Sequence, residues 1–84
     1  MKTIYDGSAY ANEIEEILIK IKERRISKNF KQEHMARALK ITQNNYSKLE
    51  SGLVPLTIEK FFKIAELLGV DVRFFLSYKT NQPL

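Results

Sequence analysis

Two glutamines near the centre of the chain, Gln32 and Gln43, stand eleven residues apart, and each opens a short amphipathic segment. Only residues 40–42 separate the two segments. Ala36 in the first segment is small enough to let two helices cross steeply after a tight turn. This layout predicts a helix-turn-helix at about residues 31–51, in which the second helix presents its N-terminal side chains to base edges in the DNA major groove.

The apolar spacing predicts one helix before this motif and two after it. Asn12 can cap the first helix, with Glu15 at the capping-box position, and the apolar stripe that follows is Ile14, Ile17, Leu18 and Ile21. Thr42 caps a helix over residues 43–50, which Gly52 can end.

The fourth helix lies between Thr57 and Gly69, and its expected core side chains are Ile58, Phe61, Phe62, Ala65 and Leu68. A fifth, short helix capped by Asp71 is expected to contain Phe74, Phe75 and Leu76.

The length and composition favour one small all-α domain. The chain has 84 residues, of which 44% are hydrophobic, and we divide it into a leader (1–12), a helix-turn-helix domain (13–78) and a tail (79–84). No cysteine is present, which excludes disulfides and thiolate metal sites and fits a reducing cytosol. No apolar run approaches the ~20 residues of a membrane span, and no signal peptide is recognisable, so we expect a cytoplasmic location.

Positive charge is concentrated around the predicted motif. Residues 20–48 hold nine basic side chains against two acidic ones, a net charge of +7. The other residues hold five basic and eight acidic side chains, which returns the +4 of the whole chain. A charge run most often marks a solvated helix face, but this one coincides with a motif that must neutralise phosphates.

Catalytic and metal chemistry find no support in the residues. His34 is the only histidine, and neither a cysteine nor a second histidine accompanies it. The carboxylates form no recognisable dyad, and no glycine-rich phosphate loop or nucleophile motif occurs. We therefore expect no enzyme, no cofactor and no metal.

Taken together, the residues resemble the Cro and phage-repressor type (Xre-like) of helix-turn-helix family over roughly residues 18–76. The family's recurrent elements appear in order as Arg25, Gln32, Ala36, Ile41, Gln43, Ser47, Glu50, Gly52, Pro55 and the run at 64–70. The resemblance implies an all-α, five-helix, lambda-repressor-like domain. Three positions depart from the usual pattern: Lys40 stands for a turn glycine, Tyr46 for a small aliphatic residue and Arg24 for an apolar one.

Base readout is expected from the start of the third helix. Glutamine and asparagine can donate and accept in one plane, which matches N6 and N7 of adenine. Gln43 and Asn44 are therefore the first candidates, and Lys48, one turn further on, can reach guanine O6 and N7. Asn45 and Ser47 are second-rank candidates. The alternative for all five is a polar side chain that covers an exposed helix face, and for Lys48 a phosphate contact would serve equally well.

The resemblance also implies contacts to the DNA backbone and one structural ion pair. Gln32 would grip a phosphate at the N-terminus of the second helix, where backbone N–H groups favour an anion, and would brace Gln43. Further candidates for contacts to the same DNA backbone are Lys28, Asn29, Lys31, Lys40 and Ser51. Such contacts fix the register of the protein on the duplex. Arg25 and Glu50 would pair and tie the first helix to the end of the third; otherwise both are ordinary surface charges.

The same resemblance implies a sequence-specific transcriptional regulator that binds double-stranded DNA, and we expect a repressor at a short inverted-repeat operator. One motif reads about half a turn of duplex, so a homodimer is expected. The favoured dimer surface is Phe74, with Leu76 and Tyr78 nearby, and an apolar edge at Ile14 and Ile19 is an alternative. Two other functions stay open: an antitoxin that also binds a toxin protein, and a protein-interaction module that has lost DNA binding.

Overall fold

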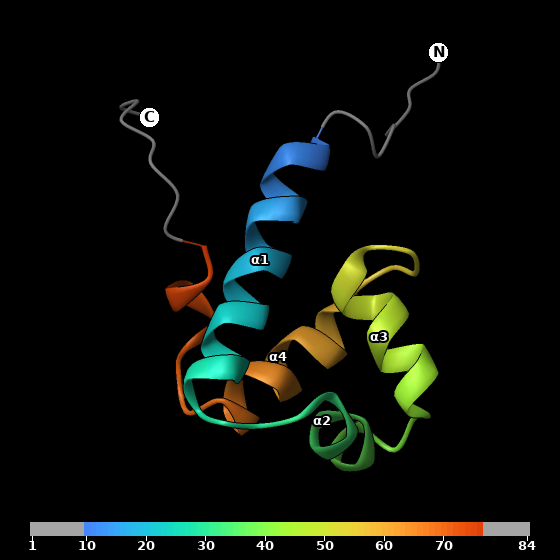
Figure 1. The fold of residues 1–84 in the computed structure, drawn as a ribbon. Coiled ribbons are helices and arrows are strands. Elements are labelled where there is room, and N and C mark those ends of the chain that lie inside the picture. Colours follow the sequence, from blue (N-terminus) through green and yellow to red (C-terminus); the bar gives the residue numbers. More distant parts are fainter. Residues whose placement is uncertain (1–9, 77–84) are drawn as a thin grey trace.

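The computed structural model describes residues 10–76, and all regular secondary structure in this range is helical. The elements in order are α1 (Ala11–Ser27), α2 (Gln32–Leu39), α3 (Gln43–Ser51), α4 (Ile58–Leu67) and a 3₁₀ turn, η2 (Val72–Phe74). Helix α2 packs against α3 and α4, α1 packs against α3, and η2 packs against α4. In Figure 1, α3 and η2 lie on opposite sides of α1. Within the described range no helix combines the length and apolar character needed to cross a bilayer.

The helix-turn-helix is present as predicted. Helix α2 begins at Gln32, α3 begins at Gln43, and the two are joined by residues 40–42. The hydroxyl of Thr42 accepts a hydrogen bond from the backbone N–H of Asn45 at 3.0 Å, which confirms the predicted cap of α3. Thr57 caps α4 in the same way, accepting from the N–H of Lys60 at 3.2 Å.

The predicted cap of the first helix is wrong. Helix α1 begins at Ala11 with Tyr10 as the N-cap residue, so Asn12 lies inside the first turn. Alanine is the strongest helix former, which favours extension of the helix past the asparagine. The capping-box pairing of Asn12 with Glu15 therefore does not define this end of α1.

Each α-helix ends at a residue with positive φ. These residues are Asn29 (φ 63°), Lys40 (φ 60°), Gly52 (φ 87°) and Gly69 (φ 72°). Two backbone hydrogen bonds close each of these helix ends. At the end of α2, the N–H of Ile41 donates to the carbonyl of Ala36 at 3.0 Å, and the N–H of Lys40 donates to the carbonyl of Arg37 at 3.1 Å. This is the Schellman arrangement, which satisfies the last carbonyls of a helix. Gly52 was expected at its helix end, whereas Asn29 and Lys40 adopt the left-handed conformation without being glycine.

The core lies between α1, the helix-turn-helix and α4. Its fully buried large side chains are Ile21, Met35, Tyr46, Leu49, Ile64, Leu68 and Phe75. The predicted apolar face of α4 needs correction, because Ile58 and Phe62 are 74% and 58% exposed. Ile64 takes the central place, since the buried face of α4 follows residues 61, 64, 65 and 68.

A fifth α-helix does not form within the described residues. The segment after Asp71 is a single 3₁₀ turn, in which the N–H of Phe74 donates to the carbonyl of Asp71 at 2.8 Å and that of Phe75 to Val72 at 3.0 Å. Asp71 still caps it as predicted, accepting from the N–H of Arg73 at 2.9 Å. Three residues separate the cap from Phe75, and this single turn is sufficient to bury that ring.

Candidate nucleic-acid interface

Helix α3 divides its side chains between the core and the solvent. Tyr46, Leu49 and Glu50 are buried, whereas the predicted base-reading residues Gln43, Asn44, Asn45 and Lys48 are exposed and Ser47 is half-buried. The cap on Thr42 fixes the first turn of this helix. The structure thus brings the candidate base-reading residues together on one solvent-facing helix surface, which we call the α3 row (residues 43, 44, 45, 47 and 48).

The predicted backbone-contacting residues lie at the turns on either side of α2 and at the end of α3. Lys28, Asn29 and Lys31 are exposed in the connection between α1 and α2, Lys40 is exposed in the turn before α3, and Ser51 is exposed at the last residue of α3. In the free protein the Ser51 hydroxyl donates to the carbonyl of Lys48 at 3.2 Å. The Lys28 ammonium lies 5.9 Å from the centre of the Phe30 ring. The exposed candidates therefore lie in the connection before α2, in the turn before α3 and at the end of α3.

Arg25 and Glu50 form the expected ion pair, and it is buried. The Nε and Nη2 atoms of Arg25 donate to Oε2 and Oε1 of Glu50 at 2.8 and 2.9 Å, and the two side chains are only 9% and 3% exposed. Arg25 Nη1 also donates to the carbonyl of Phe30 at 2.9 Å. A guanidinium meeting a carboxylate through two parallel bonds is the strongest geometry for such a pair.

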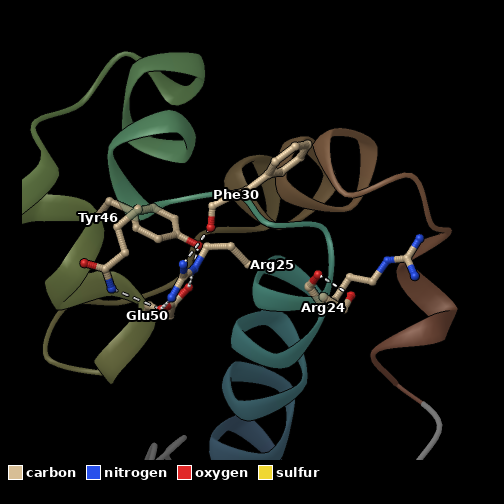
Figure 2. Close-up of polar contacts among 7 residues, drawn as sticks. Arg24, Arg25, Phe30, Tyr46 and Glu50 are labelled. Carbon is tan, nitrogen blue, oxygen red and sulfur yellow. Dashed lines mark hydrogen bonds and ion pairs between the residues drawn. The ribbon is translucent and has the colours of Figure 1, made fainter.

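Two further donors reach the same carboxylate. The hydroxyl of Tyr46 donates to Glu50 Oε2 at 2.8 Å, and the amide nitrogen of Gln32 donates to Oε1 at 3.1 Å. Figure 2 shows Arg25 and Tyr46 converging on Glu50 from different helices. We call these four residues the Glu50 network; it joins α1, the start of α2 and α3.

The network fixes the protonation of its members. Burial favours the neutral acid, but hydrogen bonds from Arg25, Tyr46 and Gln32 hold the pKa of Glu50 below its ordinary value. Burial and the bond to Glu50 raise the pKa of Tyr46 far above its ordinary value. The hydrogen bond to Glu50 likewise raises the pKa of Arg25. At neutral pH the network therefore consists of a carboxylate, a guanidinium, a phenol and an amide.

Gln32 takes a role that the sequence did not suggest. It was expected to brace Gln43, whereas in the structure its amide nitrogen braces Glu50. Its side chain is half-buried at the N-terminus of α2, and its contact with a phosphate stays a prediction. Tyr46 was missed as a polar partner altogether. The signal was available, because Tyr46 and Glu50 are four residues apart and so share one face of α3.

The predicted dimer surface lies around η2. Phe74 and Leu76 are 47% and 41% exposed, and Tyr78 lies outside the described residues. Phe74 packs edge-on against Phe75 with ring centroids 5.2 Å apart, and the guanidinium of Arg24 lies 5.7 Å from its ring centroid. Arg24 Nε also donates to the carbonyl of Leu68 at 3.0 Å, so this residue ties α1 to the end of α4 (Figure 2).

His34 is exposed on α2 and its ring lies 4.3 Å from that of Phe30, centroid to centroid. Among residues 10–76 there is no group of three or more histidine, aspartate or glutamate side chains that could hold a metal ion.

A sequence profile described as helix-turn-helix (HTH_3) matches residues 21–75, more than half of the chain. The matched range includes the whole Glu50 network and the α3 row. No curated protein and no solved structure matches the chain.

Proposed function

The chain belongs to the helix-turn-helix family of the Cro/C1, Xre-like type, and on that premise we propose that it is a transcriptional regulator that reads a short inverted repeat in DNA. Members of this family are DNA-binding regulators. In this proposal α3 enters the major groove and the protein acts as a repressor from the cytoplasm, associated with the nucleoid while it is bound.

The α3 row is the observation that carries this proposal. Gln43 and Asn44 stand exposed at the first turn of α3, where a major-groove helix makes its base contacts. Their amides suit adenine, and Lys48 suits guanine, because these groups match the donors and acceptors of those bases. Asn45 and Ser47 complete the surface and are the second-rank contacts.

Backbone contacts in this proposal come from residues outside the row. Lys31 and Gln32 stand at the N-terminus of α2, where the helix dipole favours a phosphate, and the further candidates are Lys28, Asn29, Lys40 and Ser51. The segment 20–48 carries a net charge of +7, which supports electrostatic attraction to the duplex. These contacts fix the register in which α3 meets the bases.

A homodimer is part of the proposal, because two copies related by a two-fold axis read two inverted half-sites. We place its contact at Phe74, Leu76 and Tyr78. The antitoxin and the protein-interaction module are the alternatives, and both require a protein partner in place of, or besides, DNA.

The test is a fluorescence titration of the protein with randomised duplex DNA at two salt concentrations, followed by selection and sequencing of the bound pool. We expect affinity to fall steeply with salt and an inverted repeat to be enriched. Salt-dependent binding without an enriched sequence would contradict specific regulation. The absence of binding would contradict the proposal as a whole and favour the interaction module.

A further inference from the structure

The hydroxyl of Tyr46 occupies a position in which it can control the rotation of α3 about its own axis. Tyr46 is fully buried, and its hydroxyl donates to Glu50 Oε2 at 2.8 Å, one helical turn further along the same face. The other bonds to this carboxylate come from Arg25 on α1 and Gln32 on α2. Glu50 is therefore the acceptor at which three helices meet (Figure 2).

The α3 row starts next to this buried junction, because Gln43 stands about two helical turns before Glu50, and continues round to the solvent side of the helix at Asn44 and Lys48. Gln43, Asn44 and Lys48 are exposed, whereas Tyr46 and Glu50 are buried. Because a helix behaves as a rigid rod over nine residues, a change of rotation on the buried face moves the exposed amides by a similar angle. Base readout by bidentate hydrogen bonds tolerates little angular error.

We propose that Tyr46 is a positioning residue for DNA reading, which acts through its hydroxyl on Glu50 and so sets the orientation of the α3 row. The inference rests on the proposed function and adds a residue that does not touch DNA. The ring and the hydroxyl have separate roles: the ring is buried in the hydrophobic core, and the hydroxyl supplies one of the hydrogen bonds that fix the carboxylate.

Several features of the site support this division. A buried phenol without a partner would be costly, so its bond to Glu50 is retained in the folded state. The raised pKa of Tyr46 keeps the phenol protonated and hence a donor at physiological pH. Arg25 is held independently by the Phe30 carbonyl and by its own two bonds to Glu50. Loss of the phenol bond thus loosens α3 without dismantling the ion pair.

The experiment compares Tyr46→Phe with Ile64→Val as a matched control. Both positions are fully buried, but Ile64 lies on α4 outside the Glu50 network, and its change removes one methyl group. Affinity is measured for the selected duplex and for a randomised duplex at a temperature where both variants are folded. We expect Tyr46→Phe to lower affinity for the selected duplex about tenfold, the scale of one impaired bidentate base contact. Affinity for randomised duplex should change little, because phosphates dominate it.

The ratio of the two affinities separates positioning from mere stability. Ile64→Val should leave the ratio at the wild-type value. If Tyr46→Phe also leaves it there and lowers only the melting temperature, the positioning role is overturned.

Amide hydrogen exchange on the free protein gives a second readout that does not depend on DNA. Tyr46→Phe should lower protection in α3 (Gln43–Ser51) more than in α1, whereas Ile64→Val should not single out α3. Equal loss in α1 and α3 would overturn the proposal. If the wild-type protein bound no duplex selectively, the proposed function would fail, and the exchange data would still decide whether Tyr46 orients α3.

Discussion

Arg25 and Glu50, twenty-five residues apart in the chain, meet through two parallel hydrogen bonds of 2.8 and 2.9 Å in the interior of the domain. The pair connects α1 to the end of α3, and Tyr46 and Gln32 satisfy the carboxylate further. A buried ion pair stabilises a fold only while both partners are present, because removal of one leaves the other charged and desolvated.

Arg25→Met and Glu50→Gln should therefore behave non-additively. Each single change should lower the free energy of unfolding by about 3 kcal/mol, and the double variant should lose clearly less than the sum. Urea denaturation of the four proteins measures this coupling. The exposed pair of Glu33 and Arg37, 3.2 Å apart, is the control and should show a coupling of about 0.5 kcal/mol or less. Additive losses at Arg25 and Glu50 would contradict a cooperative pair.

The lowered pKa of Glu50 predicts acid sensitivity. The unfolded chain takes up the proton near the ordinary value of 4.5, before the folded protein does, so the stabilisation is complete above that pH. It is lost as the pH falls from there through the lower pKa of the folded state. Glu50→Gln should flatten the dependence of the unfolding free energy on pH in this acidic range. Asp71→Asn is the control, since its carboxylate also has a lowered pKa but is exposed. Equal flattening by both would contradict a special role of the buried group.

Lys40 holds the turn between α2 and α3 at φ 60°, a conformation that costs a residue with a side chain about 1–2 kcal/mol. Lys40→Gly should raise the free energy of unfolding by about 0.5–1 kcal/mol, after allowance for the greater flexibility of glycine in the unfolded chain. Asn29→Gly should raise the free energy of unfolding by less, because asparagine tolerates the left-handed conformation better than lysine does. If Lys40 also contacts a phosphate, its change to glycine should stabilise the protein while weakening DNA binding; thermal melts and titrations measure both. A destabilised Lys40→Gly variant would contradict the argument from backbone strain.

The features that could be predicted from the sequence are those with local causes. Thr42, Thr57 and Asp71 cap their elements because a short oxygen-bearing side chain reaches the N–H two or three residues on, whatever the rest of the fold does. Gly52 marks a helix end for an equally local reason. The order and spacing of such signals were sufficient for the helix-turn-helix and for the exposed α3 row.

The features that were missed depend on contacts between elements. Spacing alone did not decide whether Phe62 or Ile64 faces the core, because the two lie on opposite edges of the apolar stripe of α4, and the packing of the other helices determines which edge is buried. The expected fifth helix is a single 3₁₀ turn, which is sufficient to place Phe75 in the core. Likewise, the bond of Gln32 to Glu50 joins residues eighteen apart, and only the packing of α2 on α3 brings them together.

The proposed dimer contact at Phe74 can be compared with a second exposed phenylalanine, Phe62 on α4. The side chains are 47% and 58% exposed, so a glutamate at either place meets similar solvation. Phe74→Glu should give a monomer in sedimentation experiments and weaken binding to an inverted repeat, whereas Phe62→Glu should leave the dimer intact. Circular dichroism checks that both variants fold. The reverse pattern would move the dimer contact to α4, away from η2.

Base contacts and backbone contacts should respond differently to substitution, and Gln43 and Lys31 provide the comparison. Gln43→Ala should cost about 1–3 kcal/mol of binding free energy on the selected duplex and little on a randomised one, because it removes a base contact. Lys31→Ala, at the exposed N-cap of α2, should weaken binding to both duplexes similarly and reduce the slope of log affinity against log salt by about 1. Titrations of both variants over a series of salt concentrations separate the two effects. If Gln43→Ala lowered both affinities equally, Gln43 would be a backbone contact, and sequence readout would have to be sought at Asn44 and Lys48.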